Sequence, residues 1–171
     1  MNATGYVFES LKEVYEHANH AKDALELWES LAKKHDVYIA GSYGERDVER
    51  LYDSSILYGP KGEVGKYRKT HLWNRENQYF EKGNLDYPVF EAEIRKIGML
   101  ICWDTWFPET FRILGMQGAD LILTLNNWEY TRLVPCLMTV EGEWPFTIQC
   151  ALPRQTDCLL QHTTVSGRNV G

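Results

Sequence analysis

The feature that most constrains the fold is a pair of short, mostly apolar runs, residues 96–102 and 119–125, with a helix pattern between them at 108–117. Both runs have the length of strands, and their continuous apolar sequence is typical of strands that are buried within a sheet. Pro108 stands in the first turn of the expected helix, where its missing N–H group is tolerated. Strands that alternate with helices in this way indicate an α/β domain built from packed layers.

The rest of the chain adds helical and hairpin patterns. Ser10 can cap a helix that starts at Leu11, and a second helix is expected over residues 23–34. Strands are expected at 37–43, 51–58, 63–69 and 88–93, with a turn at 59–62 and a loop carrying a short helix at 70–87. The two strands that flank the turn are predicted to pair as a hairpin.

Composition restricts the class of partner. The chain has 171 residues, of which 44% are hydrophobic and 25% charged, as in one globular domain. A net charge of −6 with scattered basic residues argues against nucleic acid and against anionic membrane surfaces. No apolar run approaches the roughly 18 residues of a membrane span, and the first residues lack the pattern of a signal peptide. These observations predict a cytoplasmic protein.

The four cysteines, Cys102, Cys136, Cys150 and Cys158, form no CxxC pair and have no metal-ligand spacing with histidine. In a reducing compartment they are expected to be free thiols. The sequence therefore predicts neither a disulfide framework nor a metal site.

Cys102 is the residue that we expect to carry the chemistry. It ends the first apolar run, and Pro108 shortly after it cannot donate to a central sheet. The cysteine is therefore expected where a strand breaks into a turn and then a helix, so that a rigid backbone presents the thiol to a pocket. The alternative is a core cysteine, because free cysteine is among the most buried residue types.

Two charged residues suit the chemistry of such a thiol. Lys69 lies at the end of the expected strand 63–69, and Glu76 lies in the following loop. A thiol with its ordinary pKa of about 8.5 is only slightly ionised at neutral pH, and a nearby ammonium group lowers that pKa. Each residue taken alone is more simply explained as a solvated surface side chain.

Three sequence blocks, taken together and in this order, resemble the nitrilase superfamily of carbon–nitrogen hydrolases. They are Lys-Tyr-Arg-Lys-x-His-Leu at 66–72, Glu-x-x-x-Phe-x-x-Gly at 76–83 and Ile-Cys-Trp-Asp-x-x-Phe-Pro-Glu at 101–109. Gly-Ala-Asp-Leu-Ile at 118–122, followed by Asn127 and Trp128, extends the resemblance, which covers about residues 1–130. The Cys-Trp-Asp triplet is more similar to the amidase and carbamoylase branches than to the true nitrilases.

The resemblance implies an α/β fold, namely a four-layer α-β-β-α sandwich that is incomplete in this chain. It implies that Cys102 is the nucleophile, Lys69 the catalytic lysine and Glu76 a glutamate that positions the lysine and the substrate. Trp103, Asn127 and Trp128 are expected to contact the substrate. It further implies a small amide or carbamoyl substrate, no cofactor, and a homodimer or larger homo-oligomer.

The chain departs from the family pattern at both ends. The family's general-base glutamate would lie immediately before Met1, so weak or absent activity is expected of the chain as written, since losing such a group costs about 10²–10⁴ in rate. Residues 131–171 lose the pattern, and neither helical nor strand periodicity is sustained there. We interpret 1–130 as a partial hydrolase core and 131–171 as a divergent, poorly ordered tail that a frameshift would explain.

Two functions from other classes stay open at the level of the sequence. The chain can be a non-catalytic remnant that serves as a binding or oligomer-forming module. It can also be a thiol protein in which Cys102, beside Lys69, senses the redox state. Thiol reactivity and amide hydrolysis, measured together, separate these hypotheses. His71 is kept as a lesser acid/base candidate because it lies two residues from Lys69.

Overall fold

A computed structural model describes residue 3, residues 8–126 and the backbone of residues 159–164. The helices are α1 (Leu11–His35) and α2 (Pro108–Met116), with 3₁₀ helices η1 (Asn74–Gln78) and η2 (Cys102–Trp106). The strands are β1 (Ile39–Asp47), β2 (Arg50–Gly59), β3 (Gly62–Arg68), β4 (Val89–Glu91), β5 (Lys96–Ile101), β6 (Leu121–Asn126) and β7 (Leu159–Thr164). They form one sheet of order β1-β2-β3 and another of order β4-β5-β6-β7.

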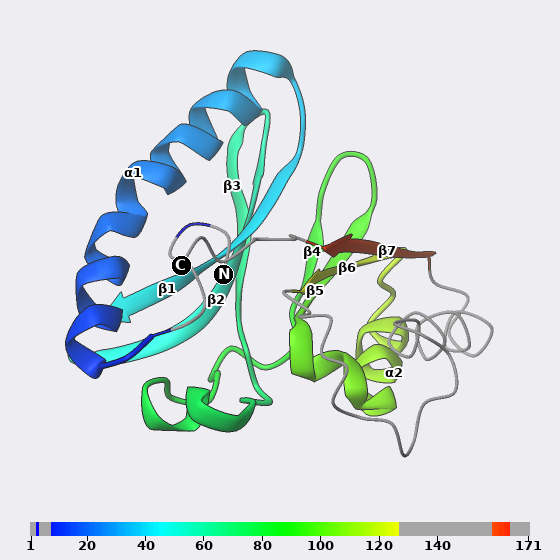
Figure 1. Ribbon diagram of the computed structural model, residues 1–171. Coiled ribbons are helices and arrows are strands. Elements are labelled where there is room, and N and C mark those ends of the chain that lie inside the picture. Colours follow the sequence, from blue (N-terminus) through cyan, green and yellow to red (C-terminus); the bar gives the residue numbers. More distant parts are fainter. Residues whose placement is uncertain (1–2, 4–7, 127–158, 165–171) are drawn as a thin grey trace.

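The first sheet is antiparallel and carries α1 on its outer face (Figure 1). The predicted hairpin is confirmed as β2 and β3. The Ser10 side chain caps α1 by accepting a hydrogen bond from the Glu13 N–H at 3.3 Å, as predicted. The prediction of two separate helices is wrong, because residues 18–23 contain no glycine or proline to break a single 25-residue helix.

The second sheet contains the two apolar runs. β5 and β6 are parallel neighbours connected through α2, and Leu100 and Ile122 of these strands pack against Phe111 and Leu114 of the helix. β7 lies parallel to β6 on the other side. It falls in the segment where no regular structure is expected, so that expectation is wrong for these six residues; the remainder of 131–171 lies outside the described residues.

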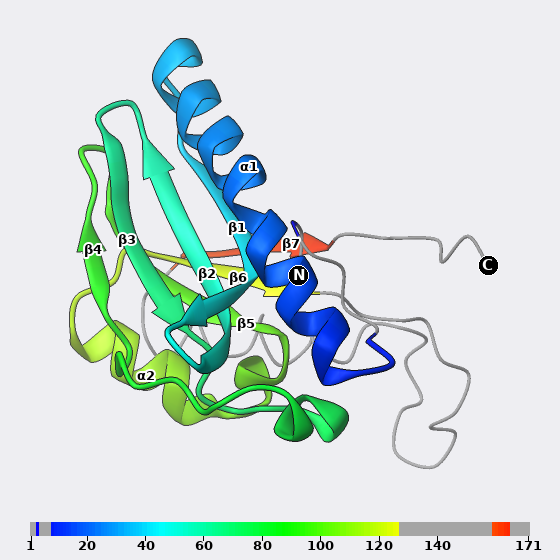
Figure 2. The same ribbon diagram turned by 90° about the vertical axis from the view of Figure 1, so that its left-hand side faces the viewer.

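The two sheets pack face to face, with Leu57 and Tyr67 of the first sheet against Met99 and Ile101 of the second. Figure 1 shows the resulting order of layers: α1, the first sheet, the second sheet and α2. Figure 2 views the molecule from the side of α1. The four-layer α-β-β-α arrangement is thus confirmed. It brings the ends of β3 and β5, which carry the candidate residues, to the same region of the molecule.

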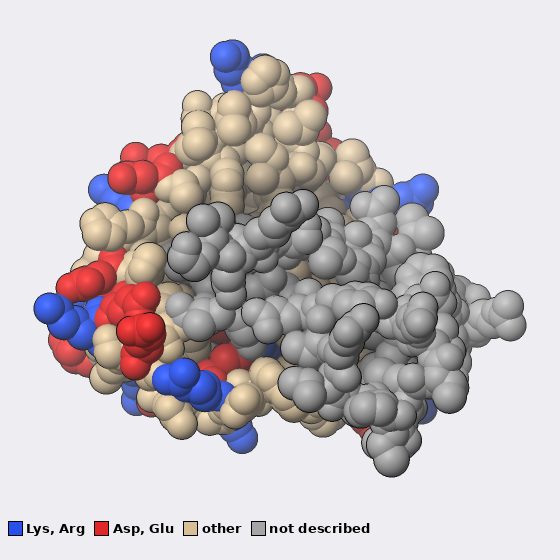
Figure 3. Space-filling model, in the orientation of Figure 1, with Lys and Arg blue, Asp and Glu red and all other residues tan. Residues whose placement is uncertain are grey.

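The surface carries both charges. On the face in Figure 3, Lys and Arg side chains lie beside Asp and Glu side chains, and the described residues of that face form no basic patch. In the described part of the chain, neither helix has the length and apolar character needed to cross a bilayer.

Candidate active site

Cys102 occupies a sharp turn at the end of β5. It is the first residue of η2 and has a φ of 45°, in the left-handed region that side chains other than glycine rarely adopt. The Thr105 hydroxyl donates to the Cys102 carbonyl at 2.7 Å and so braces the turn. The predicted succession of strand, turn and helix is confirmed. Backbone strain held in place by surrounding contacts is common at functional sites.

Cys102 forms no disulfide with another described residue and is 8% exposed, at the edge of the core between the sheets. Burial alone fits a core cysteine as well as a nucleophile. The surroundings of the thiol must therefore distinguish a nucleophile from a core cysteine. They include the charged residues Lys69, Glu76 and Asp53.

Lys69 directly follows β3 and is buried, with 1% exposed surface. Its Nζ atom lies 2.8 and 2.7 Å from the two carboxylate oxygens of Glu76, and 3.5 Å from Oδ2 of Asp53. Glu76 is also buried, at 5% exposure. The interpretation of both residues as solvated surface side chains is therefore wrong.

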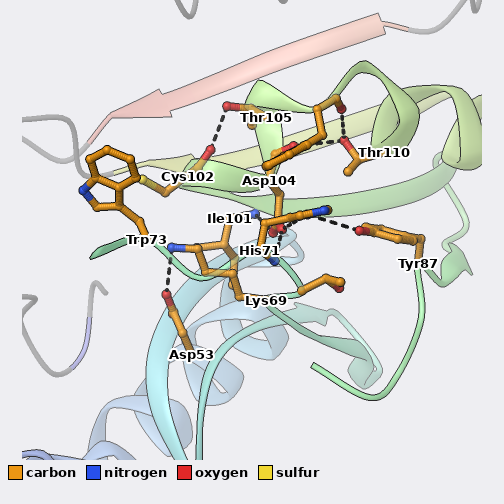
Figure 4. A network of polar contacts seen from close by, with 12 residues as sticks. Asp53, Lys69, His71, Trp73, Tyr87, Ile101, Cys102, Asp104, Thr105 and Thr110 are labelled. Carbon is orange, nitrogen blue, oxygen red and sulfur yellow. Dashed lines mark hydrogen bonds and ion pairs between the residues drawn. The ribbon is translucent and has the colours of Figure 1, made fainter. Parts of the chain in front are cut away.

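Electrostatics keep Lys69 charged. Burial alone would lower the pKa of its ammonium group, but the negative charges of Asp53, Cys102 and Glu76 outweigh burial and raise that pKa. In Figure 4 the ammonium group lies between Asp53 on one side and Cys102 on the other. A lysine that stays charged at neutral pH beside a thiol favours ionisation of that thiol.

The loop at 73–83 holds Glu76 in place. The Trp73 N–H donates to Oε2 of Glu76 at 2.7 Å, and the Phe80 N–H donates to the Glu76 carbonyl at 2.8 Å. Phe80 itself is buried in a core cluster beneath α1. The aromatic residue of the second sequence block thus anchors the 3₁₀ turn that carries the carboxylate.

Gly83, the last residue of that block, lies directly against the chain at Lys69. Its N–H donates to the Lys69 carbonyl at 2.8 Å, and a Cβ atom added to it would lie 2.0 Å from the Arg68 carbonyl oxygen. Only glycine fits so close a backbone contact. The loop therefore contacts both the main chain of Lys69, through Gly83, and its side chain, through Glu76.

Asp104 joins the lysine segment to the cysteine turn. It is fully buried; its Oδ2 accepts from the Ile101 N–H at 3.1 Å and from the Tyr67 hydroxyl at 2.8 Å. Its Oδ1 accepts from the His71 N–H at 2.8 Å and lies 3.0 Å from His71 Nδ1. From the sequence, Asp104 is only a marker of the family branch, because its spacing does not reveal partners so distant in the chain.

His71 belongs to this bracing network. Besides its contact with Asp104, its ring stacks on Phe107 with centroids 3.8 Å apart, and it turns toward Tyr87 in Figure 4. We therefore assign it to the support of the turn.

Asp53 is the second residue that the sequence patterns do not single out. It lies in β2, is 2% exposed and has one oxygen near Lys69. Burial raises the pKa of its carboxyl group to about 6; the charge of Lys69 opposes this rise, while Glu76 and Asp104 add to it. The sequence marks Asp53 only as a charged residue within a mostly apolar strand, and nothing in the sequence connects it to Lys69.

Aromatic side chains surround the cysteine turn. The Trp103 ring lies 4.0 Å from that of Trp73 and 4.7 Å from that of Trp106, measured between centroids. Figure 4 places Trp73 beside Cys102. Asn127 and Trp128, also predicted to contact the substrate, lie outside the described residues. Within those residues, no group of three His, Cys, Asp or Glu side chains is arranged to hold a metal ion.

The geometry agrees with the sequence relationship. The sequence model described as carbon–nitrogen hydrolase matches residues 1–143. The chain belongs to this family. The resemblance inferred from the three sequence blocks is thus confirmed, and the match extends past residue 130.

Individual relatives place the chain within the family. It is 41% identical over 121 residues to a nitrilase of Pyrococcus abyssi, covering 70% of this chain and 46% of the relative. It is 36% identical over 99 residues to an N-carbamoylputrescine amidase of Solanum lycopersicum, covering 55% of this chain and 33% of the relative. The chain thus spans less than half the length of these relatives.

A solved carbon–nitrogen hydrolase from Helicobacter pylori has the same fold. It superposes with a TM-score of 0.82 at 22% identity, covering 91% of this chain and 55% of that chain. At this level of identity the superposition supports the fold alone.

Proposed function

We propose that the chain carries the active site of a hydrolase that cleaves C–N bonds in small linear amides or N-carbamoyl compounds, with Cys102 as nucleophile. The observation that carries this proposal is the buried Lys69 ammonium group, held by Glu76 and close enough to Cys102 for the two charges to act on each other. A core cysteine has no need of a buried cation beside it.

In the proposed first step, the Cys102 thiolate attacks the carbonyl carbon, so that a C–S bond forms and the carbonyl oxygen becomes an oxyanion. The Lys69 ammonium group stabilises that oxyanion, together with the Trp103 N–H, which lies in the first turn of η2 where backbone N–H groups have no acceptor within the helix. The C–N bond then breaks, and the nitrogen leaves as ammonia or an amine after taking a proton.

In the second step, water attacks the resulting thioester, the C–S bond breaks, and the carboxylic or carbamic acid is released. Both steps need an acid/base group that moves a proton between thiol, nitrogen and water. We assign that role to none of the described residues. Glu76 orients Lys69 through its two hydrogen bonds and so fixes the position of the oxyanion donor.

The substrate class rests on two supports. One relative is named a nitrilase and another an N-carbamoylputrescine amidase, and the Cys-Trp-Asp triplet favours the amidase and carbamoylase branches. The aromatic side chains of Trp73 and Trp103 suit the short alkyl part of such a substrate. The homo-oligomer and the cytoplasmic location expected from the sequence belong to the same proposal, and sedimentation velocity and cell fractionation test them.

Ammonia release from a panel of short-chain amides, N-carbamoyl amines and nitriles tests the proposal. Because none of the described residues is assigned the acid/base role, we expect only slow release by the wild type. We expect loss of that release in Cys102→Ala and the wild-type rate in the matched control Cys136→Ala. Turnover that survives in Cys102→Ala contradicts the proposal. A Cys102 that reacts rapidly with iodoacetamide while no compound is hydrolysed instead supports the redox hypothesis.

A further inference from the structure

Asp53 faces Lys69 because of the register of the hairpin. The β2–β3 ladder ends with Ser54 opposite Arg68, and one more backbone hydrogen bond, from the Lys69 N–H to the Asp53 carbonyl at 2.8 Å, continues it. Residues directly opposite in an antiparallel pair project from the same face. On the other side, the β1 partner of Asp53 is Gly44, which has no side chain to offer.

The contacts of Asp53 are poorer than those of Glu76. Glu76 makes two short hydrogen bonds to the Lys69 ammonium group, whereas the nearest oxygen of Asp53 lies 3.5 Å away. Its other oxygen, Oδ1, is buried and has no hydrogen-bond partner among the described residues. A buried carboxylate that is paired so weakly is costly to ionise.

We propose that Asp53 is a positioning residue that acts through Lys69 to set how readily the Cys102 thiol ionises. This inference rests on the proposed function, in which the Cys102 thiolate attacks the substrate. Asp53 does not touch the reacting atoms in this role. It changes the net charge that the thiol experiences.

The physical argument follows from the charges around Lys69. Among the described residues, the titratable groups that act on Asp53 are Lys69 after β3, Glu76 in η1 and Asp104 in η2. Cys102, the first residue of η2, acts on Lys69. When Asp53 is ionised, two carboxylates share one ammonium group, and the site disfavours a further negative charge on sulfur. When Asp53 is neutral, Lys69 and Glu76 balance each other, and the thiolate forms more easily.

The pKa of Asp53, raised to about 6 chiefly by burial, brings this change of charge close to neutral pH. An asparagine at this position would keep the shape of the side chain and remove the charge. Asp53 therefore makes the reactivity of the thiol depend on pH in a way that an amide would not.

The pH dependence of Cys102 alkylation by iodoacetamide, followed by peptide mass spectrometry, tests the inference in wild type and Asp53→Asn. We expect the midpoint for thiolate formation to fall by about one pH unit in Asp53→Asn, so that alkylation one unit below the wild-type midpoint is roughly five to ten times faster. The matched control Asp86→Asn removes an exposed carboxylate and should keep the wild-type midpoint.

An unchanged midpoint, or a higher one, in Asp53→Asn overturns the inference. Asp53→Ser, which also removes the charge, must shift the midpoint in the same direction, and it replaces Asp53→Asn if circular dichroism shows that the latter is unfolded. Because alkylation needs no turnover, the two proposals fail separately. A shifted midpoint without hydrolysis refutes the proposed function alone, and hydrolysis without a shift refutes the role of Asp53 alone.

Discussion

Arg68 and Lys69 are consecutive buried cations that project to opposite faces of the first sheet, and they are partnered very differently. The Arg68 guanidinium group makes two hydrogen bonds to Glu45, at 2.9 and 2.8 Å, and one each to Asp47 and Asn84, both at 2.9 Å. It also stacks on Tyr52, 3.9 Å from the ring centroid. Each of the three guanidinium nitrogens donates at least one hydrogen bond, which is typical of a structural ion pair.

Lys69 has one carboxylate at hydrogen-bonding distance and a second that is held loosely. Glu76 takes both short contacts, and Asp53 keeps one oxygen without a partner in the described part of the chain. The cation thus retains positive charge for another group, and Cys102 is the group beside it. The comparison teaches that burial of a cation does not by itself indicate a catalytic site. A buried cation that is incompletely paired and lies next to a thiol does point to one.

The two carboxylates opposite these cations titrate in opposite directions. Burial would raise the pKa of Glu45, but hydrogen bonds from Arg68, Lys66 and Ser54 lower it to about 2. Burial raises the pKa of Asp53 to about 6, since Lys69 compensates it only in part. Ionised Glu45, paired with Arg68, therefore stabilises the fold, whereas ionisation of Asp53 destabilises it.

Replacing Lys69 is expected to have the largest effect. In the proposed mechanism the charge of Lys69 stabilises both the thiolate and the oxyanion. Amide hydrolysis should therefore fall by about 10⁴-fold or more in Lys69→Met, because residues of a catalytic unit act together. Initial rates of ammonia release measure this. Lys66→Met is the matched control, since Lys66 pairs with Glu45 away from Cys102; equal losses in the two variants would contradict the contrast.

Replacing Arg68 should damage stability instead. Among the described residues, Arg68→Met leaves the buried Glu45 with Lys66 and Ser54 as its remaining partners. The free energy of unfolding should therefore fall by about 3 kcal/mol, as when one partner of a buried pair is removed. Urea denaturation measures it. Lys22→Met, which breaks a pair exposed on α1, should change stability by less than about 1 kcal/mol. An Arg68 variant as stable as this control would refute the structural role.

Replacing Gly83 should displace Lys69 without altering any charge. In Gly83→Ala the new methyl group would lie 2.0 Å from the Arg68 carbonyl oxygen, so the Gly83 loop and the segment that carries Lys69 must move apart. A shift of about 1 Å in a catalytic group costs on the order of 10²-fold in rate. We expect a fall of that size in kcat, with circular dichroism unchanged. Wild-type kcat would show that the close backbone contact is dispensable.

The pH dependence of stability gives the smallest effect and compares the two carboxylates directly. The pKa of Asp53 rises from 3.8 to about 6 on folding, so its contribution favours the folded state below pH 3.8 and is lost as pH rises through 6. The pKa of Glu45 falls from 4.5 to about 2, so its contribution is present above pH 4.5 and is lost as pH falls through 2.

Urea denaturation of wild type and Asp53→Asn at pH 4 and pH 7 measures the Asp53 part. The wild type should lose on the order of 2 kcal/mol more than the variant between these values. Glu45→Gln should instead weaken the fold most at pH 7 and least below pH 2. The same pH slope in wild type and Asp53→Asn would contradict the raised pKa.

Much of the fold follows from local patterns. The hairpin, the runs that became β5 and β6, and the helix starting at Pro108 are each marked by a turn, a continuous apolar stretch or a proline. The single helix α1 was expected as two because its apolar stripe is weak near residue 20. β7 was missed because its pairing with β6 depends on the sheet and not on the periodicity of its own residues.

The site was predictable only in part. The sequence blocks name Cys102, Lys69 and Glu76, but their proximity depends on two sheets packing face to face. Asp53 meets Lys69 through the register of the hairpin, and Asp104 meets Tyr67 across the two sheets, so both partners are far away in the chain. No spacing rule reports such contacts, so these two carboxylates required the structure.

The most direct test of the account is to trap an acyl group on Cys102. The protein is mixed with a short-chain amide, quenched in acid within the first turnovers and digested for peptide mass spectrometry. The account predicts an acyl thioester on the Cys102 peptide that hydroxylamine removes and that is missing in Lys69→Met. Ammonia release with Cys102 unmodified, or with the acyl group on another residue, would contradict it.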